Sequence, residues 1–146
     1  MIKAVGTIVE DREGKILVLK RCQSIDSKKE PGTLGLPGGL IRPNTTPLES
    51  ALMKLKAEVG IDTKKSDLEG LSKYSWNDEI QRSRVEFSVF RLKLKGTRPK
   101  IIFNDIGHSA YIWNYPQELI KRKDLMMGMY FILPGVYKLP KIIHKS

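Results

Sequence analysis

A pair of glycines followed by a helical segment that carries Lys54 and Glu58 is the part of this 146-residue chain best suited to phosphate chemistry. Gly38 and Gly39 have no Cβ, so their backbone can turn sharply and come close to a phosphate group. Lys54 and Glu58 are four residues apart, a spacing that brings two side chains to one face of a helix. A lysine ammonium binds phosphate as a point charge, and a carboxylate ligates hard divalent cations. This combination predicts a site for a phosphorylated ligand.

The segment that contains these residues, GLPGGLIRPNTTPLESALMKLKAEVGI at positions 35 to 61, resembles a Nudix box. The box pattern is G-x5-E-x7-R-E-U-x-E-E-x-G-U, where U is an aliphatic residue, and it aligns with residues 39–61. The positions that match are Gly39, Leu55, Glu58, Gly60 and Ile61, and those that differ are Thr45, Met53, Lys54 and Ala57. The pattern has Glu, Arg, Glu and Glu at the four differing positions. The chain is therefore similar to MutT-like Nudix hydrolases but has a degenerate box.

The resemblance implies a hydrolase of nucleoside diphosphates linked to another moiety, with Mg²⁺ or Mn²⁺ as cofactor. In such enzymes the box helix presents carboxylates to the metal, which assists the attack of water at phosphorus. Three of these carboxylates correspond to Lys54, Ala57 and Glu58, whose charges sum to zero. Glu58 is therefore the expected catalytic residue and metal ligand, and Asp105 is the second candidate ligand. We expect activity to be weak or lost.

A second class of function stays open on the same residues, namely a non-catalytic module that binds a nucleotide, RNA or a protein partner and needs no cofactor. Gly38, Gly39 and Lys54 are then the binding residues, with the lysine ammonium standing where the metal would stand. The alternative for Lys54 is an exposed ion pair with Glu58, worth about 0.3–0.5 kcal/mol. Glu86 and the Asp78–Glu79 turn are weaker candidates for acids that assist Glu58.

Aromatic and histidine side chains carry less information. Four aromatic residues could stack on a nucleobase, although packing in or around the core is the commoner outcome: Trp76, Tyr111, Trp113 and Tyr115. His108 and His144 are too few and too far apart to predict a metal site. We expect His108 to cap or pack near the start of a strand.

The composition favours an anionic partner. The formal net charge is +10, which attracts nucleotides or nucleic acid through the overall field, although a solvated lysine-rich surface explains the same number. Cys22 is the only cysteine, so no intrachain disulfide forms, as in a reducing compartment. The chain begins without a signal-like segment, and the apolar run at 129–133 is too short to span a bilayer. We expect a cytoplasmic protein that does not bind a membrane; its oligomeric state and substrate stay open.

The elements that position the site can be read from hydrophobic periodicity. Strands are expected at 2–9, 15–20, 68–76, 84–94 and 109–114, the first two as a hairpin, and a short helix is expected after Pro116. The box helix is expected to begin at Pro47, after an N-cap at Thr46 with Glu49 completing a capping box, and to end at Gly60.

This order of elements indicates an α/β (α+β) layered fold. The Nudix resemblance, which extends over residues 2 to about 123, implies a mixed β-sheet sandwiched between α-helices. We expect one domain over residues 1–146, in which the tail at 134–146 is not assigned to an element.

Overall fold

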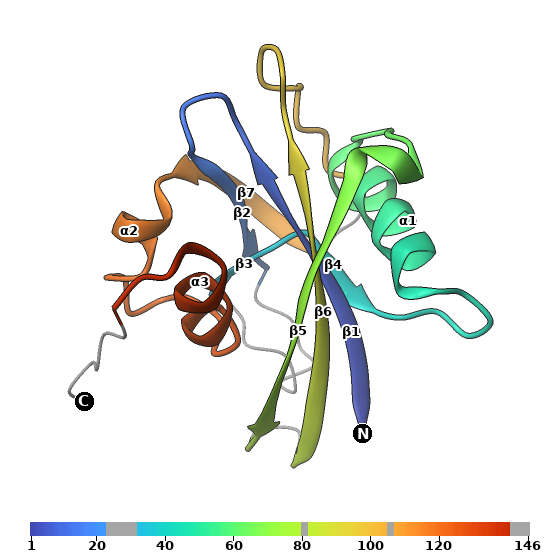
Figure 1. Cartoon of the computed structure of the whole chain (residues 1–146), viewed down its shortest axis with the longest axis vertical. Coiled ribbons are helices and arrows are strands. Elements are labelled where there is room, and N and C mark those ends of the chain that lie inside the picture. Colours follow the sequence, from blue (N-terminus) through green and yellow to red (C-terminus); the bar gives the residue numbers. More distant parts are fainter. Residues whose placement is uncertain (23–31, 80–81, 105–106, 141–146) are drawn as a thin grey trace.

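The computed structural model describes residues 1–22, 32–79, 82–104 and 107–140. The elements are β1 (Ile2–Glu10), β2 (Ile16–Arg21), β3 (Leu34–Gly35), β4 (Gly38–Leu40), α1 (Pro47–Val59), the 3-10 turn η1 (Lys65–Asp67), β5 (Leu68–Asp78), β6 (Ser83–Lys93), β7 (His108–Asn114), α2 (Pro116–Leu119) and α3 (Met129–Tyr137). Figure 1 shows α1 on one side of the sheet and α2 and α3 on the other. The predicted sheet between helices is confirmed.

The sheet is mixed, and its central strand β1 changes partner along its length. The strand order is β3-β2-β1-β6-β5, with β4 also pairing with β1 and β7 with β2. β1 runs parallel to β6 and antiparallel to β2 and β4. The predicted hairpin of β1 and β2 is paired at Glu10 and Ile16, and further along β1 its neighbour is β4, with Gly6 opposite Gly38. The glycine pair therefore lies inside the sheet, beside β1.

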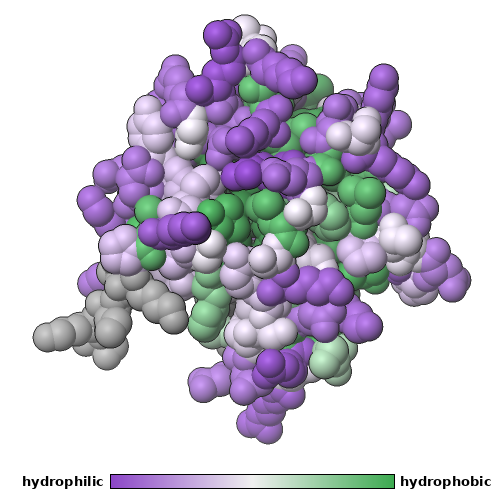
Figure 2. All heavy atoms as spheres, in the orientation of Figure 1, coloured by the Kyte–Doolittle hydropathy of each residue, from purple (hydrophilic) through white to green (hydrophobic). Residues whose placement is uncertain are grey.

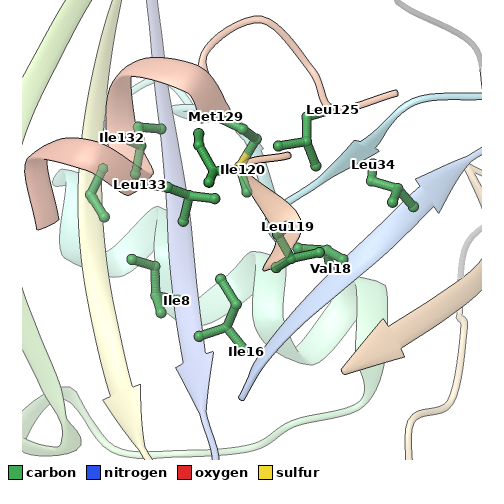
Figure 3. Close-up of a cluster of buried hydrophobic side chains, with 11 residues drawn as sticks. Ile8, Ile16, Val18, Leu34, Leu119, Ile120, Leu125, Met129, Ile132 and Leu133 are labelled. Carbon is green, nitrogen blue, oxygen red and sulfur yellow. The ribbon is translucent and has the colours of Figure 1, made fainter. Parts of the chain in front are cut away.

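Alternating side chains on the strands form two hydrophobic cores, one on each side of the sheet. The core under α1 contains Val5, Val9, Leu17, Leu19, Ala51, Leu55, Val59, Ile61, Leu68 and Leu92. The core under α2 and α3, drawn in Figure 3, contains Ile8, Ile16, Val18, Leu34, Val89, Leu119, Ile120, Leu125, Met129, Ile132 and Leu133. The side chains of β6 alternate between the two cores, since Phe87 and Val89 pack on the α3 side and Phe90 and Leu92 on the α1 side.

The box helix α1 begins and ends where the sequence predicts. The Thr46 hydroxyl accepts a hydrogen bond from the Glu49 N–H at 3.1 Å, and the Glu49 carboxylate accepts one from the Thr46 N–H at 2.9 Å. These bonds, together with the nearby Lys65 ammonium, hold the pKa of Glu49 below its ordinary value. Gly60 ends the helix with φ of 74°, a left-handed conformation that favours glycine.

The C-terminal helix α3 is the main element that the sequence does not predict. Gly128, Pro134 and Gly135 lie at its start or within it, and such residues normally argue against a helix. Tertiary packing outweighs this propensity, because the Tyr137 hydroxyl donates to Glu10 at 2.7 Å and α3 buries Ile132 and Leu133. Burial and the bond to Glu10 raise the pKa of Tyr137. None of the helices in the described part of the chain is long and apolar enough to cross a membrane.

Replacing Gly6 tests how tightly β1 packs against β6. A Cβ on Gly6 would lie 2.5 Å from the Phe87 ring. Overpacking of this kind costs typically about 1–3 kcal/mol, so we expect Gly6→Ala to lower the free energy of unfolding in urea by about 2 kcal/mol. Gly96→Ala is the matched control, since no atom lies within 4 Å of its added Cβ. Equal urea midpoints for the two variants would contradict the packing described.

Candidate functional site

Pro37 forms a bend and the glycine pair after it opens β4; this segment, called the glycine turn below, is held very close to β1. The Thr7 N–H donates to the Pro37 carbonyl at 3.0 Å. A Cβ on Gly38 would overlap the Val5 carbonyl oxygen, so only glycine fits at this position. In the structure, the backbone that Gly38 approaches closely is that of β1.

Glu58 connects the glycine turn to the box helix. Its carboxylate accepts a hydrogen bond from the Gly38 N–H at 2.9 Å, across 20 residues of sequence. The side chain is buried, with 7% of its surface exposed. A buried carboxylate needs hydrogen-bond donors, and the backbone of the turn provides one. Glu58 therefore has a structural role that the sequence analysis did not foresee.

Lys54 lies over the outer side of the glycine pair. Its Nζ atom is 3.3 Å from the position that a Cβ on Gly39 would occupy. The salt bridges within the described residues do not join Lys54 to Glu58, so the predicted ion pair between them is wrong. The reason is that the Glu58 carboxylate turns inward to Gly38 while the longer lysine side chain crosses Gly39. A positive charge consequently stands beside the glycine turn.

The loop before α1 is fixed by neutral hydroxyl groups. The Thr45 hydroxyl donates to the Arg42 carbonyl at 2.7 Å and is 2.6 Å from the hydroxyl of Ser50. Ser50 is fully buried and also accepts the Arg42 N–H at 3.0 Å. Met53 is 39% exposed. Ser50 is not among the residues predicted from the sequence, although its spacing of four residues before Lys54 and eight before Glu58 puts all three on one face of the helix.

The acidic residues of the described region do not fit a divalent cation. Glu86 on β6 forms an ion pair with Lys73 on β5 at 3.7 Å, and Ala57 offers no ligand atom. Asp105 falls outside the described residues. Residues 1–22, 32–79, 82–104 and 107–140 contain no group of three or more His, Cys, Asp or Glu side chains that could hold a metal ion. Glu58 with a lysine ammonium nearby is a poor set of ligands for Mg²⁺ or Mn²⁺.

The segment after β6 runs along the C-terminal end of α1. The Ile102 N–H donates to the Val59 carbonyl at 3.0 Å, and the Asn104 side-chain amide donates to the Lys56 carbonyl at 3.3 Å. The His108 ring is stacked with Phe103, with their centroids 6.2 Å apart. The expectation that His108 packs near the start of a strand is confirmed.

The four aromatic candidates for base stacking are separated by the fold. Phe103 meets Tyr111 edge-on, with centroids 6.0 Å apart, on the α1 side of the sheet. Trp113 is also part of the α1-side core, and the Arg98 guanidinium lies 4.9 Å from its ring centroid. The Lys15 ammonium lies 5.3 Å from the Tyr115 ring. Trp76 lies instead on the opposite side, against α3.

Comparison with known proteins agrees with this architecture. The family model described as NUDIX domain matches residues 2–134 of the chain. The crystal structure of a MutT NUDIX hydrolase from Burkholderia pseudomallei is similar, with a TM-score of 0.76 and 20% identity over 92% of this chain and 97% of that one. A search of curated proteins found no match.

Two further solved structures contain nucleotide derivatives. The NUDIX domain of Shewanella oneidensis NrtR, complexed with ADP ribose, gives a TM-score of 0.75 and 15% identity over 94% of this chain and 87% of that one. A bifunctional NMN adenylyltransferase/ADP ribose pyrophosphatase from Francisella tularensis, complexed with AMP and a Mn ion, gives 0.75 and 17% over 94% of this chain and 41% of that one. At these identities the similarity establishes the fold.

Truncating Glu58 tests its structural role. Glu58→Ala leaves the Gly38 N–H without its carboxylate, and an unsatisfied buried donor costs about 1–3 kcal/mol. We expect that loss of unfolding free energy in urea denaturation, and a smaller one for Glu58→Gln, whose amide oxygen can still accept. Lys56→Ala on the same helix is the control, because its ion pair with Asp62 is exposed and worth little. If Glu58→Ala unfolds at the same midpoint as the control, the bond to Gly38 does not stabilise the fold.

Proposed function

Because this chain belongs to the NUDIX domain family, we propose that it binds a nucleoside diphosphate derivative at the Gly38–Gly39 turn and hydrolyses it weakly or not at all. The observation that carries this proposal is the Lys54 ammonium, which lies beside Gly39 instead of pairing with Glu58. Gly38 and Gly39 allow close approach of a phosphate, and Lys54 neutralises part of its charge. The ADP ribose bound by one solved structure of the same fold belongs to this chemical class, and the AMP bound by another is a nucleoside monophosphate.

The charge of the site supports binding more than turnover. In a metal-dependent Nudix enzyme, the divalent cation neutralises the phosphate charge and assists the attack of water. In this chain we propose that the Lys54 ammonium supplies the positive charge in place of the cation. A unit positive charge 4 Å from a phosphate oxygen contributes about 4 kcal/mol of attraction at the dielectric typical of a protein surface, before desolvation is subtracted. The formal charge of +10 adds a field that speeds the association of any anion.

Residual hydrolysis is the second candidate function, and one observation favours it. Asn104 is tied to the C-terminal end of α1 by its bond to the Lys56 carbonyl, and Asp105 is the next residue in the chain. Glu58 and Asp105 are the two residues proposed to hold Mg²⁺ or Mn²⁺ in that case. The two alternatives to a nucleotide ligand are RNA and a protein partner, and the net charge of +10 is compatible with an anionic one.

Binding without metal is the first test of the proposal. We expect isothermal titration calorimetry in EDTA to detect binding of ADP-ribose, and Lys54→Glu to weaken it at least tenfold, because the charge beside Gly39 is reversed. Lys56→Glu changes the charge equally on a side chain that is 70% exposed and paired with Asp62, and should alter the affinity less than threefold. Equal losses in the two variants, or binding only with added Mg²⁺, would show that Lys54 does not form the site.

Turnover is the second test. Purified protein is incubated with ADP-ribose and dinucleoside polyphosphates in Mg²⁺ or Mn²⁺, and released nucleotide is measured by chromatography. We expect release close to the rate without protein, and no further decrease in Glu58→Gln. Metal-dependent turnover that Glu58→Gln abolishes would establish the hydrolase and contradict a function in binding alone.

A further inference from the structure

We propose that one end of the β-sheet is a second anion-binding site, separate from the glycine turn, and that it binds the phosphate backbone of a duplex nucleic acid. This site, called the basic end below, is formed by three segments: the β1–β2 turn (10–15), η1 with the residue before it (64–67) and the end of β6 with the loop after it (93–100). Figure 1 shows these segments together at the top of the view. The glycine turn pairs with β1 at Gly6, five residues before Asp11 and therefore about 16 Å away along the strand.

Positive charge is concentrated at the basic end. Its 18 residues carry eight basic and four acidic side chains, so they hold four of the ten net positive charges of the chain. The opposite ends of β1, β5 and β6, at 1–3, 73–79 and 82–86, carry four basic and three acidic side chains. Figure 2 shows hydrophilic residues over most of the upper end of the molecule. An excess confined to one end directs the electrostatic field toward an anionic partner at that end.

Arg98 is held in place by a buried carboxylate and an aromatic ring. The Asp11 carboxylate, which is buried, accepts hydrogen bonds from the Arg98 Nε and Nη2 atoms, each at 2.9 Å. The guanidinium lies 4.9 Å from the Trp113 ring centroid, yet 41% of the arginine side chain stays exposed. Asp11 also accepts the N–H groups of Glu13 and Lys15, so it joins the β1–β2 turn to the loop after β6. An arginine fixed in this way loses little side-chain entropy when its remaining N–H groups donate to a phosphate.

An open recess of about 580 Å³ lies between the β1–β2 turn and the loop after β6. Three basic side chains line it: Arg12, Lys15 and Arg98. The Lys15 ammonium is supported by the Tyr115 ring, 5.3 Å from its centroid. The two acidic side chains of the recess compete weakly with a phosphate, because Asp11 is bonded to Arg98 and the 3.7 Å pair of Glu13 with Lys15 is exposed. The recess therefore presents ordered positive groups to an anion.

The basic residues span four neighbouring strands, which suits a polyanion better than a single phosphate. The order β2-β1-β6-β5 places Lys15 at one side of the basic end and Lys64 and Lys65 at the other, and three strand spacings amount to about 14 Å. One strand of a duplex carries a phosphate about every 3.4 Å of its axis, so about four phosphates face this length. Proteins that bind single strands stack bases on aromatic rings, whereas the Trp113 and Tyr115 rings carry cations over their faces. A duplex contacted at its phosphates, without regard to sequence, is therefore the favoured partner.

Fluorescence anisotropy with a short labelled DNA duplex tests this binding. Four neutralised phosphates predict that the association constant falls with salt at a log–log slope of about −3.6, so the Kd should rise roughly 100-fold between 50 and 200 mM salt. A duplex of unrelated sequence and an RNA duplex should bind with similar affinity, and a separated single strand more weakly. Absence of duplex binding at the lower salt, an affinity that does not change with salt, or preference for a polyglutamate peptide over the duplex would overturn the proposal.

Paired charge reversals locate the site. Arg12→Glu combined with Lys95→Glu should weaken duplex binding at least tenfold and reduce the salt slope by about two. The matched control, Lys3→Glu combined with Arg84→Glu, makes the same change of net charge with exposed side chains at the opposite end of the sheet, and should weaken binding less than threefold. Equal losses in the two would show that the basic end is not the site. Lys95→Ala leaves the Asp11 bonds intact and should lower the slope by about one, so the prediction can be checked even if the double variant does not fold.

Lys54→Glu separates the basic end from the proposed nucleotide site. This variant should weaken ADP-ribose binding but change duplex affinity less than threefold, and saturating ADP-ribose should not displace the duplex. Displacement by ADP-ribose, or loss of duplex binding in Lys54→Glu, would place the duplex at the glycine turn and overturn the second site. If the duplex binds and ADP-ribose does not, the proposed function fails and the basic end stands.

Discussion

The hydrogen bond from the Gly38 N–H to the Glu58 carboxylate is the interaction on which the arrangement of the site depends. It joins the first residue of β4 to the last turn of α1, and the close contact of Gly38 with the Val5 carbonyl joins the same residue to β1. Two strands and a helix thus meet at one residue. Because a buried carboxylate is costly without donors, the bond also fixes the direction in which Glu58 points.

The orientation of Glu58 determines the charge that the site presents. With its carboxylate turned inward and 7% exposed, the negative charge is used by the fold, and the half-buried Lys54 remains at the surface of the glycine pair. At Thr45, where the box pattern has a charged residue, neutral hydroxyl bonds to Arg42 and Ser50 hold the loop. Because Thr45 and Met53 replace the glutamate and the arginine of the pattern together, neither ion is left without its partner. The loop and helix are thus preserved while the net negative charge of the box pattern at Lys54, Ala57 and Glu58 is lost.

Local rules account for the part of the fold that the sequence predicts well. The ends of α1 follow from Thr46, Glu49 and Gly60, whose capping bonds involve residues at most a few positions apart. The alternation on β6 follows from the two-residue repeat of a strand. In contrast, the sequence of α3 has a low helix propensity. The helix is stabilised by tertiary contacts such as the hydrogen bond from the Tyr137 hydroxyl to Glu10, which lies 127 residues away in the sequence. Of the two orientations that the sequence leaves open for Lys54, the ion pair with Glu58 is wrong, because helix spacing does not reveal that the Gly38 N–H binds the Glu58 carboxylate.

Residues that maintain the fold differ from residues that carry out the chemistry, so membership of the family identifies the fold but not the reaction. Glycines in this chain serve packing as well as close approach to a ligand: Gly6 lies under Phe87, Gly128 under Trp76, and Gly38 against Val5. The packing at these three positions requires glycine whether or not a ligand binds. Charged side chains on the exposed surface of the box helix are not packed against backbone in this way, so they can be replaced without loss of the fold. The match to the NUDIX domain model therefore identifies the fold of this chain. Its reaction has to be inferred from the charged side chains present at the site, Lys54 and Glu58.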